Sequence, residues 1–300
     1  MPSPGPPAIL VYNPRAGRWP KERLVADLVR ELATDGPPIE AHATRGRGDA
    51  TALAREASAA GAPIVFALGG DGTLREAAAG LLGSDTVLGV LPGGTANVVA
   101  RALGLPAEPL AAARALKGLP ALAIDVGRCG DEIFLMQASL GLDARALRAV
   151  SPLAKRWLGR AAVVLAGLGA WWRHDDAEFE LLVDGHSVGA TFAAACNLAF
   201  YGGDARLAPG ARPDDGLLDV VLFRGAGRRA TLAFVRDVLA GRHLERDDVS
   251  VLKAVEVVIL DPDVALQIDG DPIANRLGTE IRLAGQRLRI LAPSTIMSPR

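Results

Sequence analysis

Cysteine, histidine and aromatic side chains are scarce in this chain of 300 residues. It contains two cysteines and four histidines, and aromatic residues make up 4% of it. Cys129 and Cys196 lie far apart in the sequence, so we expect reduced thiols in a packed core rather than a disulfide framework. No two histidines stand at the spacing of metal ligands, which argues against a zinc site.

An excess of one charge and a long hydrophobic run are also missing. The net charge is −1 and no basic tract is present, which excludes sequence-independent binding of nucleic acid. The longest apolar run, residues 161–172, is shorter than the roughly 20 residues that span a bilayer. The proline-rich first residues lack the charged and apolar regions of a signal peptide. We therefore expect a cytoplasmic protein whose contact with a membrane, if any, is peripheral at the inner face.

Hydrophobic residues make up 50% of the chain, which is enough for a packed core in one large domain or two of ordinary size. Strand and helix patterns alternate over residues 1–120, which predicts an α/β domain with a mostly parallel sheet. The expected strands there are residues 8–12, 39–44, 64–68 and 87–91, and the expected helices are residues 21–34, 49–60, 74–82, 97–103 and 109–116.

From residue 121 to residue 286 strand patterns follow one another with few helices, which predicts an antiparallel β-rich domain. The expected strands are residues 124–126, 133–138, 179–183, 187–196, 217–223, 255–260, 264–268 and 281–283. Helical insertions are expected at residues 142–172 and 228–239. Asp184 and Gly185 form a typical hairpin turn between two of these strands.

Three apolar strands of the first domain each run into a polar loop rich in glycine or proline. The loops are residues 13–18, residues 69–73, which read Gly-Gly-Asp-Gly-Thr, and residues 91–97, which read Leu-Pro-Gly-Gly-Thr-Ala-Asn. In an open α/β sheet such loops gather at the carboxyl ends of the strands, where ligands bind. Glycine allows the backbone to approach a ligand, and amides at a helix start attract anions.

Asp71 is unusual in such a loop because a carboxylate repels phosphate unless a cation lies between them. We therefore interpret the loops as a site for a metal–nucleotide, with Asp71 facing the metal or its water shell. No Gly-x-x-x-x-Gly-Lys-Ser/Thr motif is present, so the chain is not a P-loop enzyme. Arg15 and Arg18 are candidates for the positive charge that a P-loop lysine supplies.

Five motifs in this order resemble the diacylglycerol kinase catalytic-domain superfamily, which includes bacterial lipid kinases and sphingosine kinases and is distantly similar to NAD kinases. The motifs are residues 13–17, 69–73, 91–97, 215–220 and 269–272, and the resemblance spans nearly the whole chain. It implies an NAD kinase-like α/β domain and a C-terminal β-sandwich, with residues 287–300 returning to the first domain. It also implies ATP bound between the two domains, Mg²⁺, and a lipid substrate.

The resemblance implies a role for individual positions. The nucleotide contacts would be Asn13, Arg15, Thr44, Gly69, Gly70, Asp71, Gly72, Thr73, Arg75, Gly94, Thr95 and Asn97. A Mg²⁺ site would use the carboxylate of Asp215 and the backbone carbonyls of Arg212 and Leu217. Asp271 would be the general base and Asp71 would organise the metal and the phosphates.

Four positions depart from the family pattern. Ala16 replaces a serine, Arg75 replaces an asparagine, Val98 stands where an aspartate is common, and Asp271 replaces a glutamate. Val98 weakens the assignment of diacylglycerol as substrate more than it weakens the assignment as a kinase. The side chain of Asp271 is one methylene shorter than that of glutamate, which reduces the distance over which it can act as the base.

Each candidate also has a purely structural interpretation. Asp71, Asp215 and Asp271 are ordinary turn residues in this view, and Asn97 is a helix cap. In the same view Thr44 and Thr95 are ordinary hydroxyls at strand ends. Arg15 and Arg18 are solvated surface residues. Residues 153–172, with three tryptophans near basic residues, suit either a membrane surface or a helix packed on the β domain.

The preferred hypothesis is an ATP- and Mg²⁺-dependent lipid kinase that phosphorylates a hydroxyl of a diacylglycerol-like or long-chain-base lipid, with a role in phospholipid metabolism. A second hypothesis is a nucleotide- or lipid-binding regulator with weak or lost catalysis. A third is a kinase for a soluble alcohol such as NAD. The sequence leaves open whether the protein forms a homodimer.

Overall fold

The computed structural model describes residues 5–17, 21–34, 36–141, 144–145, 178–202 and 205–297. The chain forms two compact units. The first consists of Met1–Ile124 and Gln286–Ser298, and the second consists of Asp125–Gly285 with the last two residues. The chain therefore leaves the first unit, forms the second, and returns to the first.

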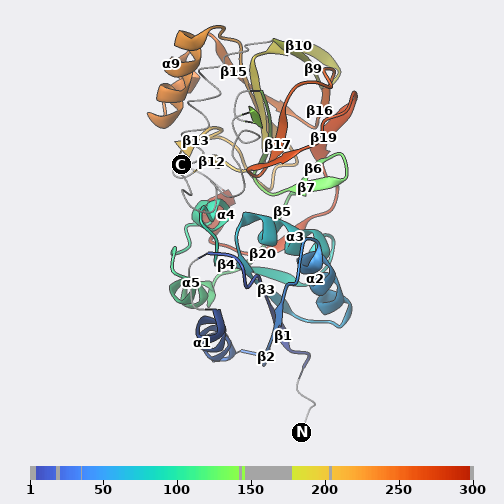
Figure 1. The fold of residues 1–300 in the computed structure, drawn as a ribbon, viewed down its shortest axis with the longest axis vertical. Helices are drawn as coiled ribbons and strands as arrows, with labels where there is room; N and C mark the ends of the chain where they lie inside the picture. The colour runs from blue at the N-terminus through green and yellow to red at the C-terminus, as the bar shows by residue number, and fades with distance from the viewer. Residues whose placement is uncertain are drawn as a thin grey trace. The chain divides into compact units, whose positions relative to one another are not determined.

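The first unit is built on a six-stranded sheet with the order β2-β1-β3-β4-β20-β5 (Figure 1). Four neighbouring pairings are parallel and only β5 runs antiparallel to its neighbour, so the prediction of a mostly parallel sheet is confirmed. The strands are β1 (Ala8–Tyr12), β2 (Ile39–Ala43), β3 (Ile64–Gly69), β4 (Val87–Pro92), β5 (Ala121–Ile124) and β20 (Leu288–Leu291).

Helices cover both faces of this sheet (Figure 1). α2 packs against α3 and α1 packs against α5. The α2–α3 contact is close because Gly80 has no side chain, since a Cβ there would lie 2.4 Å from the Thr51 carbonyl oxygen. The helices are α1 (Lys21–Ala33), α2 (Asp49–Ala59), α3 (Asp71–Leu81), α4 (Val98–Ala102) and α5 (Pro109–Leu116).

One expected strand lies elsewhere than predicted. Residues 124–126 were expected to open the β-rich domain, but the strand here is β5, which ends at Ile124 and pairs with β20 in the first sheet. No strand was predicted from the sequence at residues 288–291, which form β20. A strand flanked by two others can be short, because both of its edges are hydrogen-bonded.

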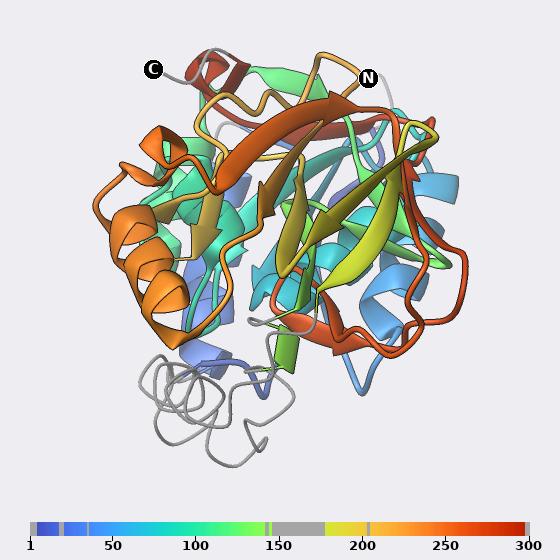
Figure 2. The same cartoon turned by 90° about the horizontal axis from the view of Figure 1, so that it is seen from above.

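The second unit is a sandwich of two six-stranded sheets, with the orders β10-β9-β16-β19-β6-β7 and β15-β14-β11-β8-β17-β18 (Figures 1 and 2). Every pairing is antiparallel, as predicted. Side chains from both sheets form one core, among them Leu140, Leu181, Val220, Val257 and Ile281. Along β9, β16 and β19 these buried positions alternate with more exposed ones, as expected for a sheet with one face in a two-layer core.

The sandwich strands are β6 (Gly127–Cys129), β7 (Glu132–Phe134), β8 (Gln137–Gly141), β9 (Phe179–Val183), β10 (His186–Ala190), β11 (Phe192–Cys196), β14 (Leu218–Phe223), β15 (Val249–Ala254), β16 (Glu256–Ile259), β17 (Leu266–Ile268), β18 (Asp271–Ile273) and β19 (Thr279–Leu283). A short hairpin, β12 (Phe200–Gly202) and β13 (Ala205–Arg206), a helix α9 (Arg228–Leu239) and two short 3₁₀ helices, η1 (His243–Glu245) in the second unit and η2 (Ser294–Met297) in the first, complete the described elements.

Two predicted strands are each divided between the two sheets. Residues 187–196 form β10 in one sheet and β11 in the other, with the break at Thr191, whose hydroxyl donates to the Phe223 and Gly225 carbonyls. Residues 133–138 end one strand, β7, and begin another, β8. An apolar run shows that a strand is buried, but it does not show where the chain changes sheets.

Both cysteines are buried thiols, as expected. Burial raises the pKa of the Cys129 thiol to about 12, so this thiol stays protonated at neutral pH. Within the part of the chain that the structure describes, no helix is long and apolar enough to cross a membrane. The predicted helical insertion at residues 142–172, with its tryptophan-rich segment 153–172, lies outside the described residues apart from Ala144 and Arg145.

Candidate active site

The three polar loops of the first unit meet at the carboxyl edge of its sheet. The backbone N–H of Asn13, after β1, donates to the Leu68 carbonyl of β3 at 3.0 Å. The Asn13 side-chain amide donates to the Thr73 hydroxyl at 3.3 Å. Gly93, after β4, donates its N–H to the Gly69 carbonyl at 2.8 Å. The predicted gathering of these loops is therefore present in the structure.

Close backbone contact between two of the loops requires glycine. A Cβ on Gly94 would lie 2.5 Å from the Cα of Gly70, and a Cβ on Gly93 would lie 2.9 Å from the Gly69 nitrogen. A Cβ on Gly69 would lie 2.6 Å from the Thr73 Cβ. The glycines thus allow two strand ends and their backbone amides to lie side by side.

Asn97 holds the third loop in shape. Its side chain accepts the Gly94 N–H at 2.8 Å and donates to the Gly94 carbonyl at 3.0 Å. It stands at the N-cap position of α4 with φ of 48°, but its side chain makes no cap bond to that helix. The interpretation as a helix cap is therefore wrong for the side chain, and its ordering of the loop is confirmed.

Asp71 is the first residue of α3, directly after the N-cap Gly70. One of its carboxylate oxygens accepts the backbone N–H of Val99, in the first turn of α4, at 3.2 Å. The residue is partly buried. Asp71 therefore joins the starts of two helices and adds a negative charge beside the glycine loops.

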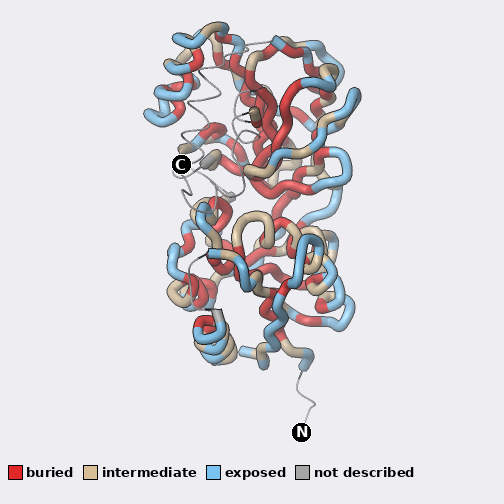
Figure 3. The backbone as a smooth tube through the Cα atoms, in the orientation of Figure 1, coloured by how far each residue is buried: buried red, intermediate tan, exposed pale blue. Residues whose placement is uncertain are grey.

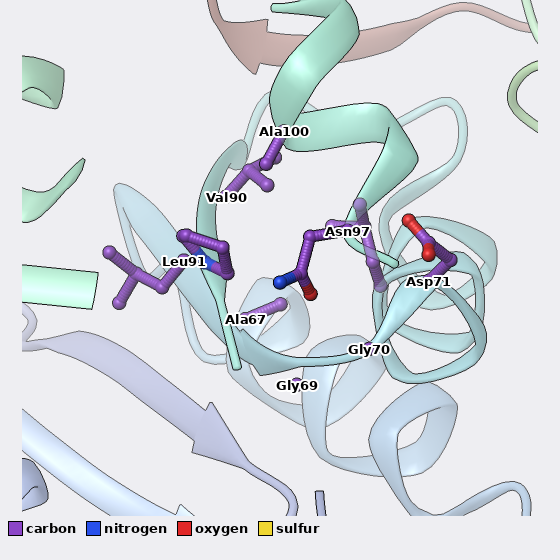
Figure 4. A pocket seen from close by; sticks show the side chains of 10 residues that line it. Ala67, Gly69, Gly70, Asp71, Val90, Leu91, Asn97 and Ala100 are labelled. Atoms are coloured by element: carbon purple, nitrogen blue, oxygen red, sulfur yellow. The ribbon is translucent and has the colours of Figure 1, made fainter. Parts of the chain in front are cut away.

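A small hollow lies beneath these loops, and Figure 4 shows the residues that line it. Its volume is about 10 Å³, which is about the room that one water molecule needs. A nucleotide would therefore have to lie over the loops and not in the hollow. The lining residues are Ala67, Gly69, Gly70, Asp71, Leu74, Val90, Leu91, Pro92, Asn97 and Ala100.

The other predicted nucleotide contacts surround the same edge. Thr44 is buried directly after β2, and its N–H donates to the Tyr12 carbonyl at 2.8 Å. Arg15 and Thr95 are exposed. Arg75 is buried on α3 and already interacts with other groups of the protein, which limits its reach toward a ligand. Arg18 lies outside the described residues.

The predicted Mg²⁺ site lies in the second unit, in the loop before β14. One oxygen of Asp215 accepts the Leu217 N–H at 3.2 Å, and the other accepts the Lys253 ammonium at 2.6 Å. Lys253 also lies 3.5 Å from Asp219. The bond to Asp215 raises the pKa of Lys253, so the ammonium stays charged. Burial raises the pKa of Asp219, and Lys253 acts against this increase.

This arrangement does not fit a Mg²⁺ ion, because a protein cation already holds the single carboxylate of the predicted ligand set. The side chain of Arg212, another member of that set, pairs with Asp214 at 3.2 Å. Among the described residues, no three histidine, cysteine, aspartate or glutamate side chains are grouped to hold a metal ion. The Mg²⁺ site at Asp215, Arg212 and Leu217 stays a prediction.

The two aspartates of the motif Asp-Gly-Asp have different positions. Asp269, with φ of 47°, and Gly270, with φ of 84°, form the turn between β17 and β18. The Asp269 carboxylate accepts three backbone N–H groups, from Leu135 at 2.8 Å, Met136 at 2.9 Å and Gln137 at 3.1 Å. Asp271 is the first residue of β18 and is partly buried.

The sequence interpretation missed three residues that hold these loops. Asp269 joins the β17–β18 turn to the break between β7 and β8. Asp125 accepts the Gly216 N–H at 2.9 Å and so holds the loop that contains Asp215. Lys253, on the unpredicted strand β15, is the cation of that loop. A second carboxylate two residues before Asp271 was a visible signal for Asp269, whereas the other two depend on contacts distant in sequence.

The chain combines an α/β unit, in which glycine loops meet, with an antiparallel sandwich. The diacylglycerol kinase catalytic domain matches residues 7–129, and the YegS C-terminal NAD kinase beta sandwich-like domain matches residues 136–292. The chain belongs to the diacylglycerol kinase catalytic-domain superfamily. The predictions of family, fold class and enzyme class are confirmed.

Related proteins cover nearly the whole chain. A protein of Chromohalobacter salexigens named probable lipid kinase YegS-like is 35% identical over 88% of this chain and 86% of its own length. The diacylglycerol kinase of Bacillus subtilis is 31% identical over 88% of this chain and 89% of its own length. The crystal structure of a diacylglycerol kinase from Bacillus anthracis has a TM-score of 0.74 at 22% sequence identity. The match covers 97% of this chain and 98% of that one. The last likeness concerns the fold alone.

Proposed function

We propose that this protein transfers the γ-phosphate of ATP to a hydroxyl group of a diacylglycerol-like or long-chain-base lipid. The observation that carries the proposal is the meeting of the loops after β1, β3 and β4, with Gly69, Gly93 and Gly94 allowing backbone contact. Amides at such strand and helix ends favour phosphate groups. The relatives named lipid kinase and diacylglycerol kinase support the choice of a lipid as acceptor.

In the proposed reaction the lipid hydroxyl attacks the γ-phosphorus. The new O–P bond forms while the bond from the γ-phosphorus to the bridging oxygen breaks, and ADP leaves. The hydroxyl proton passes to the carboxylate of Asp271, a role that we assign from the family resemblance. Asp271 belongs to the second unit and the glycine loops belong to the first.

Asp71 has the second role in this proposal. ATP binds to kinases as a complex with Mg²⁺, which neutralises the charge on the phosphate oxygens. The carboxylate of Asp71 would act on that substrate-bound ion or on its water shell. The hydrogen bond from the Val99 N–H helps to orient this carboxylate beside the loops.

The Asp71→Asn variant tests this assignment. The amide oxygen of asparagine can still accept the Val99 N–H, so the fold should persist while the charge is lost. We expect the rate of lipid phosphorylation to fall by about 100-fold or more, since charge stabilisation is usually the largest catalytic contribution. The measurement is transfer of labelled phosphate from ATP to a panel of lipids, together with the melting temperature.

Asp184→Asn is the matched control. Asp184 also accepts backbone N–H groups, from Val255 at 3.1 Å and Glu256 at 3.0 Å, but it lies on the β9–β10 turn of the second unit. This variant should keep full activity. Full activity in Asp71→Asn would contradict the proposed role. Tight ATP binding without any turnover would favour the regulator, and a water-soluble product would favour a kinase for a polar alcohol.

A further inference from the structure

Helix α9 has an apolar stripe on its solvent side. Leu232, Val235 and Leu239 are 54%, 41% and 73% exposed, and their spacing of three and four residues places them on one face of the helix. Leu244, in η1 just after the helix, is 44% exposed. We call these four residues the α9 stripe. Figure 3 shows exposed positions alternating with buried ones along this helix.

The stripe is not needed to attach the helix to its own unit. The opposite face of α9 is already buried through Thr231, Phe234 and Val238. Phe234 stacks on Phe223 of β14 with ring centroids 4.3 Å apart. Figure 2 shows α9 at one edge of the second unit. A helix that is buried on one face and apolar on the other has a second surface to cover.

Arginines flank the stripe. Arg229 and Arg236 are seven residues apart, so they lie along one side of the helix next to Leu232 and Leu239, and all four are exposed. Arg242 is also exposed, between the helix and η1. Exposed apolar side chains beside cations are typical of segments that lie in the interface of an anionic membrane.

The one acidic residue of α9, Asp237, offsets part of this charge. It is buried on the inner face, where its carboxylate accepts hydrogen bonds from Arg236 and from Arg246, the latter at 2.9 Å, and lies 3.6 Å from Arg242. Glu245, in η1, is the one exposed acidic side chain within residues 228–245. Four arginines, Arg228, Arg229, Arg236 and Arg242, lie in the same range, so its net charge is positive.

We propose that α9 and η1 dock this protein onto the surface of a membrane that contains anionic phospholipid. The α9 stripe would enter the boundary between headgroups and acyl chains, while the arginines would contact lipid phosphates. This inference rests on the proposed function, since a lipid acceptor lies in such a surface. A second copy of the chain is a poorer occupant, because a twofold contact would bring the arginines of both copies together.

Vesicle binding without ATP tests the proposal. The full chain is mixed with vesicles of phosphatidylcholine, with or without phosphatidylglycerol, and the bound fraction is measured by flotation. The double variant Leu232→Gln/Leu239→Gln should bind the anionic vesicles about tenfold more weakly or worse, because membrane affinity scales with buried apolar area. The double variant Arg229→Gln/Arg242→Gln should lose most of its preference for phosphatidylglycerol and its sensitivity to salt.

Leu277→Gln is the matched control. Leu277 is 71% exposed but lies between β18 and β19, away from α9 in the sequence, so its replacement should leave vesicle binding unchanged. Unchanged binding in both double variants would overturn the proposal. So would a change from dimer to monomer, seen by light scattering in the leucine variant with vesicle binding intact, because the stripe would then be an interface between copies.

Kinase assays separate this inference from the proposed function. With a short-chain lipid dispersed in solution, the α9 variants should keep the wild-type kcat, while with vesicle-embedded lipid their apparent KM should rise. If no lipid is phosphorylated but vesicle binding still depends on the stripe, the proposed function fails and the docking surface is upheld. If dispersed lipid is phosphorylated and the stripe variants behave as wild type on vesicles, only the docking surface fails.

Discussion

At the scale of single residues, Gly70 and Gly94 lie opposite each other in the two glycine loops but tolerate a side chain very differently. A Cβ on Gly94 would lie 2.5 Å from the Cα of Gly70, whereas a Cβ on Gly70 would lie 3.6 Å from the Cα of Gly94, which is an ordinary contact. Gly70 is also in the extended region, with φ of −86°. The two positions therefore form a matched pair of tests.

We expect Gly94→Ala to destabilise the protein by about 1–3 kcal/mol, because overpacking forces two backbone segments apart. Gly70→Ala should cost much less stability, since the new methyl group has room. Thermal unfolding of both variants measures the difference. Equal melting temperatures for the two variants would show that the loops are not in the close contact described here.

The chemistry of the site could be predicted from the sequence where it depended on local pattern. A strand followed by a glycine loop predicted a helix next in the chain, but its expected start, residue 74, lies three residues after Asp71, where α3 begins. The loop role of Asn97 followed from its neighbours Gly93 and Gly94. The partners of Asp215 could not be predicted in this way. Lys253 is 38 positions away, and only the register of two strands brings it to this carboxylate.

At the scale of elements, the pair β14–β15 is an example of how register determines charge. Asp219 of β14 stands directly opposite Lys253 of β15. Cross-strand neighbours of opposite charge attract, and the lysine is long enough to reach Asp215 as well. Lys253, the cation that pairs with Asp215 in the loop before β14, is therefore positioned by the sheet.

Removing that cation should destabilise the second unit. We expect Lys253→Met to cost about 1–2 kcal/mol, below the value for a fully buried pair because Lys253 is half-exposed. Mg²⁺ should leave the melting temperature of the wild type unchanged and should restore part of the loss in the variant. The comparison is thermal unfolding of both proteins with Mg²⁺ and with a chelator.

Lys117→Met is the control, because Lys117 pairs with Glu31 in the first unit, at 2.9 Å, and has no part in this loop. It should show no response to Mg²⁺. A melting temperature of the wild type that rises with Mg²⁺ concentration would show instead that an ion displaces Lys253 from Asp215, in agreement with the site that the family resemblance implies.

The division of predicted strands also belongs to this scale. Local pattern predicted β9 and the β9–β10 turn, because Asp184 and Gly185 carry a turn signal of their own. It did not divide residues 187–196, because Thr191 fits a strand and its role depends on carbonyls of Phe223 and Gly225. β15 was missed because its exposed and buried positions carry a weak apolar pattern.

At the scale of the whole molecule, the last strand of the chain lies inside the first sheet. β20 pairs with β4 on one side and with β5 on the other, and β5 has no other strand neighbour in the described sheet. The first unit is therefore assembled from two segments that are separated by the whole of the second unit.

We expect deletion of residues 286–300 to prevent stable folding of the first unit, because β5 loses its pairing and β4 becomes an exposed edge. Deletion of residues 293–300 leaves β20 in place and should have a much smaller effect. Hydrogen exchange of the amides in β4 and β5, followed in both truncated proteins, measures this. Protected amides in the longer deletion would contradict the importance of β20.

The position of β20 also orders events during synthesis on the ribosome. The sandwich is continuous in sequence, so its strands all emerge before the final strand of the α/β sheet does. The glycine loops follow β1, β3 and β4, and the last of these strands gains its outer neighbour only after the whole sandwich has been translated. A nascent chain that lacks β20 therefore cannot hold the complete six-stranded sheet, and premature termination yields a protein with an open β edge that is prone to aggregation.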